Sequence, residues 1–158
     1  MACSTTSSIG MPPEVAQAGA ALHWRALEGL YASAPINQVF DSRLAIEERH
    51  FHAAGAAHGT VYFKMLDDAA FYAANTLVTD RFLLTTSFNL HFTRPVRSGV
   101  IRAEGRWISG RKRVLVAEAR LVDEEGEEIG RGTGTFMRSR IALSGLAGYA
   151  AGLRSATE

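Results

Sequence analysis

The sequence predicts an α+β domain in which one curved antiparallel sheet wraps around a central apolar helix. Residues 59–78 are apolar on nearly every side of a helix, and a helix without a polar face is normally buried. Four segments with the patterning of strands follow at short intervals, which is typical of strands joined by tight turns. One sheet packed on one buried helix is the layer arrangement that results.

An N-terminal helix and a first strand are expected ahead of the buried helix. Pro12 and Pro13 suit the first turn of a helix, and Pro35 ends it because the residue before a proline disfavours the helical conformation. Residues 39–50 alternate apolar and charged side chains, which predicts a strand. The small residues at 53–57 then form a loop.

The second half of the chain is expected to be an antiparallel meander of four strands. The residues that alternate or are rich in strand formers are 84–93, 100–108, 114–122 and 128–137. Turns are expected at 95–99, 109–111 and 123–126. We therefore expect a flexible segment over residues 1–12, one domain over 13–140 and a C-terminal tail over 141–158, which is either loosely ordered or a short helix.

Composition excludes several classes of protein. A chain of 158 residues with 47% hydrophobic and 21% charged residues has the balance of a globular domain, and its net charge of +1 does not indicate a nucleic-acid or membrane partner. Cys3 is the only cysteine, so no intrachain disulfide can form. With no targeting segment recognised and no apolar run long enough for a bilayer, we expect a cytoplasmic protein.

Two adjacent acids, Asp67 and Asp68, interrupt the apolar helix. Burying an unpaired carboxylate is costly, so each needs a partner or a function. Asp68 lies four residues after Lys64 and can pair with it. Asp67 has Phe63 and Phe71 at its four-residue neighbours, and apolar surroundings raise a carboxyl pKa, which suits a general base or nucleophile. Spacing alone leaves open that Asp67 caps a loop or meets an arginine of the sheet.

The residues His58, Gly59 and Thr60 stand at the start of the same helix. A helix start presents free backbone N–H groups, glycine lets a ligand approach them, and a developing oxyanion would be stabilised there. The alternative is that Gly59 only permits a turn and His58 packs locally. His50, His52 and His58 do not form a familiar ligand spacing, and no nearby cysteine supports a metal site.

Cationic side chains gather at two of the expected turns, one with Arg94 and Arg97 and the other with Arg111, Lys112 and Arg113. They are either solvated turn residues or contacts for the phosphates of a nucleotide-bearing substrate. No phosphate-binding glycine loop or nucleophile elbow is present in the sequence.

The sequence resembles the hotdog-fold thioesterases, a group that includes the acyl-CoA thioesterases of phenylacetate degradation. The resemblance rests on residues 52–60, on Asp67 nine residues after His58, and on residues 90–96 and 132–136. It covers roughly residues 36–137, and the His-Gly step with an acid at that spacing is its most specific part.

The resemblance implies a hotdog fold, no cofactor, and dimers or dimers of dimers with active sites at the dimer interface. Asp67 falls at the catalytic acid, Gly59 at the backbone N–H that polarises the thioester carbonyl, and Thr85 at a hydroxyl that positions water and would come from the partner subunit. Two positions depart from the family pattern: His52 replaces a frequent asparagine and Thr60 a frequent second glycine.

The expected activity is hydrolysis of an acyl-CoA to free acid and CoA, with Arg94, Arg111 and Lys112 as candidate phosphate contacts. A protein of the same fold can also bind a thioester without hydrolysing it. A third class, a hotdog hydratase, would need an Asp and His pair on one loop, whereas Asp67 and His58 have the thioesterase spacing.

Overall fold

The computed structural model describes residues 13–156, and the expected flexible segment 1–12, with Cys3, lies outside them. The helices are α1 (Pro13–Ser33), α2 (Gly59–Asn75) and α3 (Ala147–Ser155), with short 3-10 helices η1 (Pro35–Gln38), η2 (Glu48–His50) and η3 (Leu143–Gly145). The strands are β1 (Arg43–Ala45), β2 (Arg81–Phe92), β3 (Val100–Ser109), β4 (Val114–Val122) and β5 (Glu128–Ala142).

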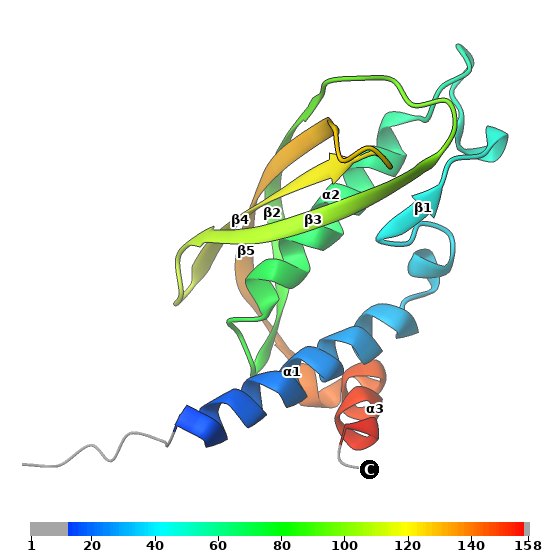
Figure 1. The fold of residues 1–158 in the computed structure, drawn as a ribbon. Coiled ribbons are helices and arrows are strands. Elements are labelled where there is room, and N and C mark those ends of the chain that lie inside the picture. The colour runs from blue at the N-terminus through cyan, green and yellow to red at the C-terminus, as the bar shows by residue number, and fades with distance from the viewer. Residues whose placement is uncertain (1–12, 157–158) are drawn as a thin grey trace, which may run out of the picture.

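The strands form one antiparallel sheet in the order β1-β3-β4-β5-β2, which curls around α2 (Figure 1). Strands β3, β4 and β5 form a meander as expected, but β2 pairs with β5 and not with β3. The tight turn predicted at 95–99 is therefore wrong. This segment is a crossover that runs from β2, at one edge of the sheet, past β5 and β4 to β3. Tyr62 of α2 holds the crossing in place: its hydroxyl donates to Arg94 O at 3.1 Å and accepts from Val96 N at 3.0 Å.

Helix α2 supplies the centre of the core. Its side chains at Val61, Met65, Leu66 and Ala70 are at most 1% exposed and face the sheet, whose own inward side chains include Leu115 and other fully buried residues. Burial of one such side chain contributes about 1.5–3 kcal/mol. The apolar pattern that predicted a buried helix is thus explained by the sheet that surrounds it, and the α+β class is confirmed.

Helices α1 and α3 pack against each other beyond one end of the sheet (Figure 1). They approach closely at Gly29 of α1, where an added Cβ would lie 2.7 Å from Gly148 O. A second apolar cluster forms between them from Ala26, Leu27, Leu30, Leu143 and Tyr149. The segment after residue 140 thus continues β5 to Ala142 and then forms a packed short helix, which is one of the two forms expected for it. Among residues 13–156, no helix has both the length and the apolar character needed to cross a membrane.

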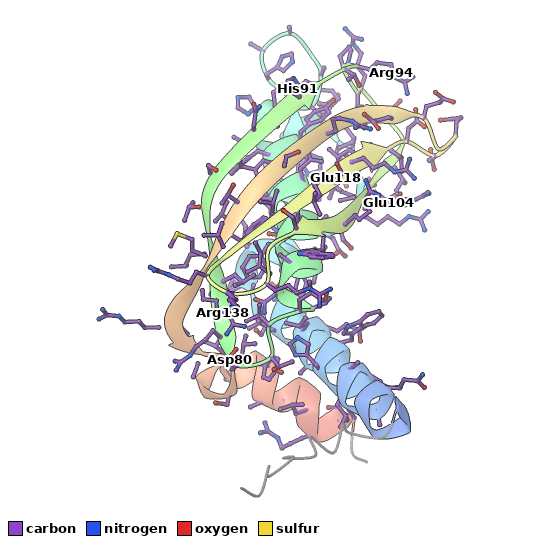
Figure 2. The ribbon with its side chains drawn as sticks, turned by 90° about the vertical axis from the view of Figure 1, so that its left-hand side faces the viewer. Asp80, His91, Arg94, Glu104, Glu118 and Arg138 are labelled. Carbon is purple, nitrogen blue, oxygen red and sulfur yellow. The ribbon has the colours of Figure 1, made fainter. Side chains whose placement is uncertain are left out.

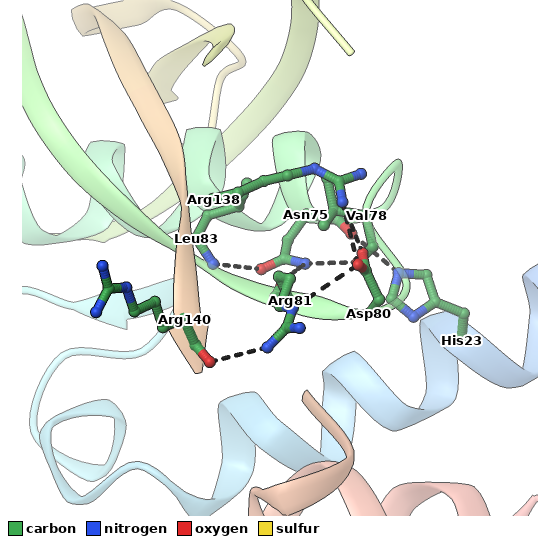
Figure 3. Close-up of polar contacts among 8 residues, drawn as sticks. All are labelled: His23, Asn75, Val78, Asp80, Arg81, Leu83, Arg138 and Arg140. Atoms are coloured by element: carbon green, nitrogen blue, oxygen red, sulfur yellow. Dashed lines mark hydrogen bonds and ion pairs between the residues drawn. The ribbon is translucent and has the colours of Figure 1, made fainter. Parts of the chain in front are cut away.

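A buried polar junction links α1, α3 and the end of α2. Asn75 O can only accept, so His23 donates to it from Nε2 at 2.9 Å, and the neutral ring then accepts from the Tyr149 hydroxyl at Nδ1, 2.7 Å away. The Asn75 side chain donates to Val78 O at 2.9 Å and accepts from Leu83 N at 3.4 Å (Figure 3). This junction fixes the turn from α2 into β2.

The strand predicted over residues 39–50 is mostly wrong. Only Arg43–Ala45 pairs, with β3, and both flanks are 3-10 helices. Pro35 begins η1, and His50 ends η2 with its Nδ1 accepting from Glu47 N at 3.0 Å. Side-chain hydrogen bonds of this kind offer the backbone an alternative to the strand ladder.

Candidate functional site

Asp67 and Thr85 form a polar pair beside the buried helix. Asp67 lies in the third turn of α2, and Thr85 lies in β2. The Thr85 hydroxyl donates to Asp67 Oδ1 at 2.9 Å. The contact lies within one chain, whereas the resemblance implied a hydroxyl supplied by a partner subunit.

Strand β2 directs Thr85 toward the helix, and a bulge follows directly after this residue. The register with β5 shifts between Thr85 and Ser87. Leu83 is fully buried and Leu84 is 49% exposed, whereas further along the strand Phe88 is the side chain that packs on the core. Thr85 lies two residues after Leu83, so ordinary alternation gives it the same inward face. The bulge of one residue then exchanges the two faces of the strand, which is why Phe88 also faces inward. The single alternation predicted over residues 84–93 is therefore interrupted.

The carboxyl of Asp67 is harder to ionise than an exposed one. Burial beside α2 is the main cause that raises its pKa above the ordinary 3.8, and the charge of Asp68 raises it further. The Thr85 hydrogen bond and the charge of Lys64 act in the opposite direction. A carboxylate in apolar surroundings with a raised pKa has the properties of a general base or nucleophile.

Asp68 has a different partner. It forms an ion pair with Lys64, four residues earlier on α2, as the spacing predicted. The side chains of Lys64 and Asp68 are only 14% and 24% exposed. The two adjacent acids therefore differ: Asp68 is bound to a cation, and Asp67 is bound to a neutral hydroxyl.

The start of α2 is capped by His58. Its Nδ1 accepts from Thr60 N at 3.1 Å and also lies 2.9 Å from the Thr60 hydroxyl. The neutral ring thus carries its proton on Nε2. Gly59 is the first helical residue, where the backbone N–H has no carbonyl one turn earlier to bond. His58 caps the helix, and the adjacent N–H of Gly59 remains a donor for a ligand.

A pocket of about 320 Å³ lies at this helix start. It is lined by His52, Ala57, Gly59, Tyr62, Phe92, Thr93, Arg94 and Pro95. Phe92 covers Gly59, because a Cβ added at Gly59 would lie 3.2 Å from the phenyl ring. The His52 ring accepts from Ala54 N at 3.0 Å, so it is oriented by its own loop.

One chain does not bring Gly59 and Asp67 together. They are eight residues apart on α2, and a rise of 1.5 Å per residue separates them by about 12 Å along the helix axis. A single thioester carbonyl cannot contact both. The chain carries two half-sites: the Asp67–Thr85 pair, and the pocket at Gly59.

The candidate phosphate contacts are separated as well. Arg94 pairs with Asp123 at 2.9 Å near the start of β3. The turn after β3 holds Lys112 and Arg111, whose guanidinium lies 5.1 Å from the Trp107 ring centroid. Ten residues of strand, about 33 Å, lie between the two turns. Figure 2 shows Arg94 at the opposite end of the sheet from Asp80. The two groups cannot serve one nucleotide within a chain.

The three histidines considered as metal ligands have other partners. His50, His52 and His58 each use Nδ1 to accept a nearby backbone N–H. Within residues 13–156 no group of three or more His, Cys, Asp or Glu side chains is arranged to hold a metal ion.

Comparison with known proteins finds a family match over part of the chain. The profile of the Thioesterase superfamily matches residues 54–129, a range that contains Gly59, Asp67, Thr85 and Arg94. Over these residues the chain is similar to the thioesterase superfamily, and its fold is the hotdog fold. A proposed esterase of Saccharolobus solfataricus is 29% identical over 90 residues, which span 57% of this chain and 60% of that protein. The match thus covers less than two thirds of that relative.

Two solved structures share the fold of this chain. The E. coli PaaI protein from the phenylacetic acid degradation operon superposes with a TM-score of 0.70 at 14% identity, over 78% of this chain and 97% of that one. A Bacillus halodurans protein solved with CoA superposes with a TM-score of 0.62 at 22% identity, over 82% of this chain and 97% of that one.

Sequence reasoning missed two residues at or near the candidate site. Phe92 was expected to be one of several alternating strand residues, and only the pairing of β2 with β5 brings it over Gly59. Asn37, which is 9% exposed, binds Lys64 through Oδ1. No periodic pattern indicates either contact, because both depend on segments that are distant along the chain.

Proposed function

We propose that this protein hydrolyses an acyl-CoA thioester to the free acid and CoA, with Asp67 as the catalytic carboxylate. The observation that carries the proposal is the position of Asp67: it is a half-buried acid with a raised pKa on a largely apolar helix, bonded to the Thr85 hydroxyl and, among residues 13–156, paired with no cation. The partial match to the thioesterase superfamily and the CoA-bound neighbour support a thioester as the substrate class.

Two routes use the same carboxylate. Acting as a general base, Asp67 takes a proton from water while the water oxygen bonds to the thioester carbon. Acting as a nucleophile, its oxygen bonds to that carbon directly, and water later hydrolyses the mixed anhydride. In either route the carbon–sulfur bond breaks, and the CoA thiolate leaves and is protonated. The Thr85 hydroxyl fixes the orientation of the carboxylate.

The carbonyl would be polarised by the N–H of Gly59 from a second copy of the chain. The separation of about 12 Å between the two half-sites rules out one chain as the source of both. Strand β2 is bonded to β5 on one side only, so its outer edge is free to pair with another β2. A two-fold axis at that edge sets the two α2 helices antiparallel, which brings Asp67 of one copy toward Gly59 of the other.

The CoA nucleotide would lie near Arg94, which lines the pocket at Gly59. The Arg94 side chain is 48% exposed in its ion pair with Asp123, so a phosphate can compete for the guanidinium. Arg111 and Lys112 could reach a nucleotide only from another copy. We propose a cytoplasmic, cofactor-independent enzyme that works as a dimer or a dimer of dimers.

The function is tested by measuring CoA release from a panel of short, medium, long-chain and aryl acyl-CoAs, with binding measured in parallel by calorimetry. The proposal expects turnover of at least one class. Tight binding of several thioesters without CoA release would favour a non-catalytic thioester-binding protein.

The shared site is tested by mixing two variants, Gly59→Pro and Asp67→Asn, under conditions that exchange subunits. Each variant alone is expected to be nearly inactive. Half of the dimers in a random mixture are mixed, and each mixed dimer has one intact site of two, so about one quarter of the wild-type activity should return. A mixture as inactive as its components would contradict a site built from two copies.

A further inference from the structure

The ammonium of Lys64 is held by three acceptors. Its Nζ donates to Asp68 Oδ2 on α2, to Asn37 Oδ1 on η1, and to Phe40 O at 3.1 Å. A lysine ammonium has three hydrogens, so these bonds use all of them. The side chain is 14% exposed, which leaves little room for water as an alternative partner.

The position of Asn37 is itself fixed. Its Nδ2 donates to Tyr31 O at 2.7 Å, which assigns the amide orientation and directs Oδ1 at Lys64. Tyr31 also lies under the ammonium, with Nζ 5.6 Å from the ring centroid. The end of α1 and the η1 segment thus form a fixed socket for Lys64, and we name the group of Asn37, Lys64 and Asp68 the lysine socket.

Helical spacing gives Lys64 two acids within reach. Asp67 is three residues ahead and Asp68 four, and both spacings allow an ion pair on one helix. The structure pairs Lys64 with Asp68 on the side of α2 that faces α1, and leaves Asp67 on the side that faces Thr85 of β2. The choice between the two acids is therefore made by Asn37 and the Phe40 carbonyl, which lie only on the Asp68 side.

We infer that the lysine socket is a positioning device, which withholds Lys64 from Asp67 and so keeps the catalytic carboxylate free of a cationic partner. This inference rests on the proposed thioester hydrolysis. An ion pair with Lys64 would lower the basicity of Asp67 and would compete with Thr85 for its orientation. Both effects reduce the reactivity of a base or nucleophile.

The charged groups that act on Asp67 come from its own helix. They are Asp68 and Lys64, while the hydroxyl of Thr85 faces the carboxyl from β2. Among the described residues, no charged group of the sheet contributes to the shift of its pKa. Tyr31 of α1 and Tyr72 of α2 face Asp68 instead, and their own pKa values are raised by burial first and by the Asp68 charge as well. The position of the Lys64 ammonium therefore determines how much positive charge Asp67 experiences.

The decisive variant is Asp68→Asn, which keeps the shape of the side chain and removes the anion that holds Lys64. We expect kcat/KM at pH 7 to fall about tenfold, and the acid limb of the pH profile to move to lower pH. The ¹³C titration of the Asp67 carboxyl should move in the same direction in the absence of substrate.

Two further variants separate positioning from simple loss of charge. Asp68→Glu supplies a new anion for Lys64 and should recover most of the lost activity. Asp68→Asn combined with Lys64→Met removes the cation together with its anion, and should also recover activity and return the Asp67 titration toward that of the wild type. Recovery by the double variant is the result that a merely structural role for Asp68 would not produce.

The inference is overturned if Asp68→Asn leaves the titration of Asp67 unchanged, or if the double variant is as impaired as Asp68→Asn. If Asp68→Asn does not fold, the double variant alone decides: activity lost to the level of Asp67→Asn contradicts the inference, and retained activity supports it. A wild-type protein that releases no CoA would refute the proposed function. An active enzyme whose rate does not depend on the lysine socket would refute only the present inference.

Discussion

The Thr85 hydroxyl donates a 2.9 Å hydrogen bond to the carboxylate of Asp67 within one chain. We expect Thr85→Val to reduce kcat about tenfold, because the carboxylate loses the group that orients it. Since this bond lowers the pKa of Asp67, its loss should also shift the acid limb of the pH profile to higher pH. The matched control is Thr86→Val, whose hydroxyl donates to Thr135 O and not to an acid. Equal losses in both variants would contradict a role for Thr85.

At Gly59, the effect of losing the backbone N–H can be separated from the effect of adding a side chain. Gly59→Pro removes the N–H at the first position of the helix, where proline is tolerated, and His58 already has the extended conformation that precedes a proline. Loss of one oxyanion donor should reduce kcat about 100-fold to 1,000-fold. Gly59→Ala adds the same Cβ beside Phe92 and keeps the N–H, so it is the control. If the kcat of Gly59→Pro is no lower than that of Gly59→Ala, this N–H is not the donor to the carbonyl.

The raised pKa of Asp67 has a consequence for stability. The folded carboxyl binds its proton more tightly than the unfolded one, so its contribution to stability is present below the ordinary pKa of 3.8 and is lost as the pH rises through the folded pKa. Asparagine does not titrate. We therefore expect Asp67→Asn to melt a few degrees above the wild type at pH 7, with a smaller difference at about pH 3.5. Calorimetry that finds no stabilisation at pH 7 would contradict the burial of this charge.

The buried junction of His23, Asn75 and Tyr149 should contribute to stability and not to catalysis. Tyr149→Phe leaves His23 Nδ1 without a donor in a buried site, which should cost about 1–3 kcal/mol of unfolding free energy. Tyr72→Phe is the control, because the Tyr72 hydroxyl has no hydrogen bond to any residue of the range 13–156. Chemical denaturation measures both, and a similar small loss in the two variants would contradict the prediction.

Local features of this fold could be predicted from the sequence, and distant contacts could not. The buried helix, its Lys64–Asp68 pair and the three strands β3, β4 and β5 follow from periodicity and turn residues within short windows. The pairing of β2 with β5 does not, because the crossover after Phe92 has the same composition as a tight turn.

The same difference between local features and distant contacts holds for the candidate site and for the packing around it. Asp67 is an acid whose four-residue neighbours in the helix are both phenylalanines, so it could be singled out from the sequence. Its bond to Thr85 depends on how β2 lies against α2, and the bulge that follows Thr85 inserts one residue into β2 without a local sequence signal. The contact of His23 with Tyr149 joins residues 126 positions apart, and the socket around Lys64 depends on how α1 docks.

The central claim is that Asp67 performs the hydrolysis of an acyl-CoA. The most direct test compares CoA release by the wild type and by Asp67→Asn on the best substrate of the panel. Asp80→Asn is the surface control, because it disturbs only the ion pairs of a largely exposed acid with Arg138 and Arg81. We expect Asp67→Asn to reduce kcat at least about 100-fold while the control stays near the wild type. If Asp67→Asn retains the wild-type rate, Asp67 is a structural acid and the proposed catalytic role is wrong.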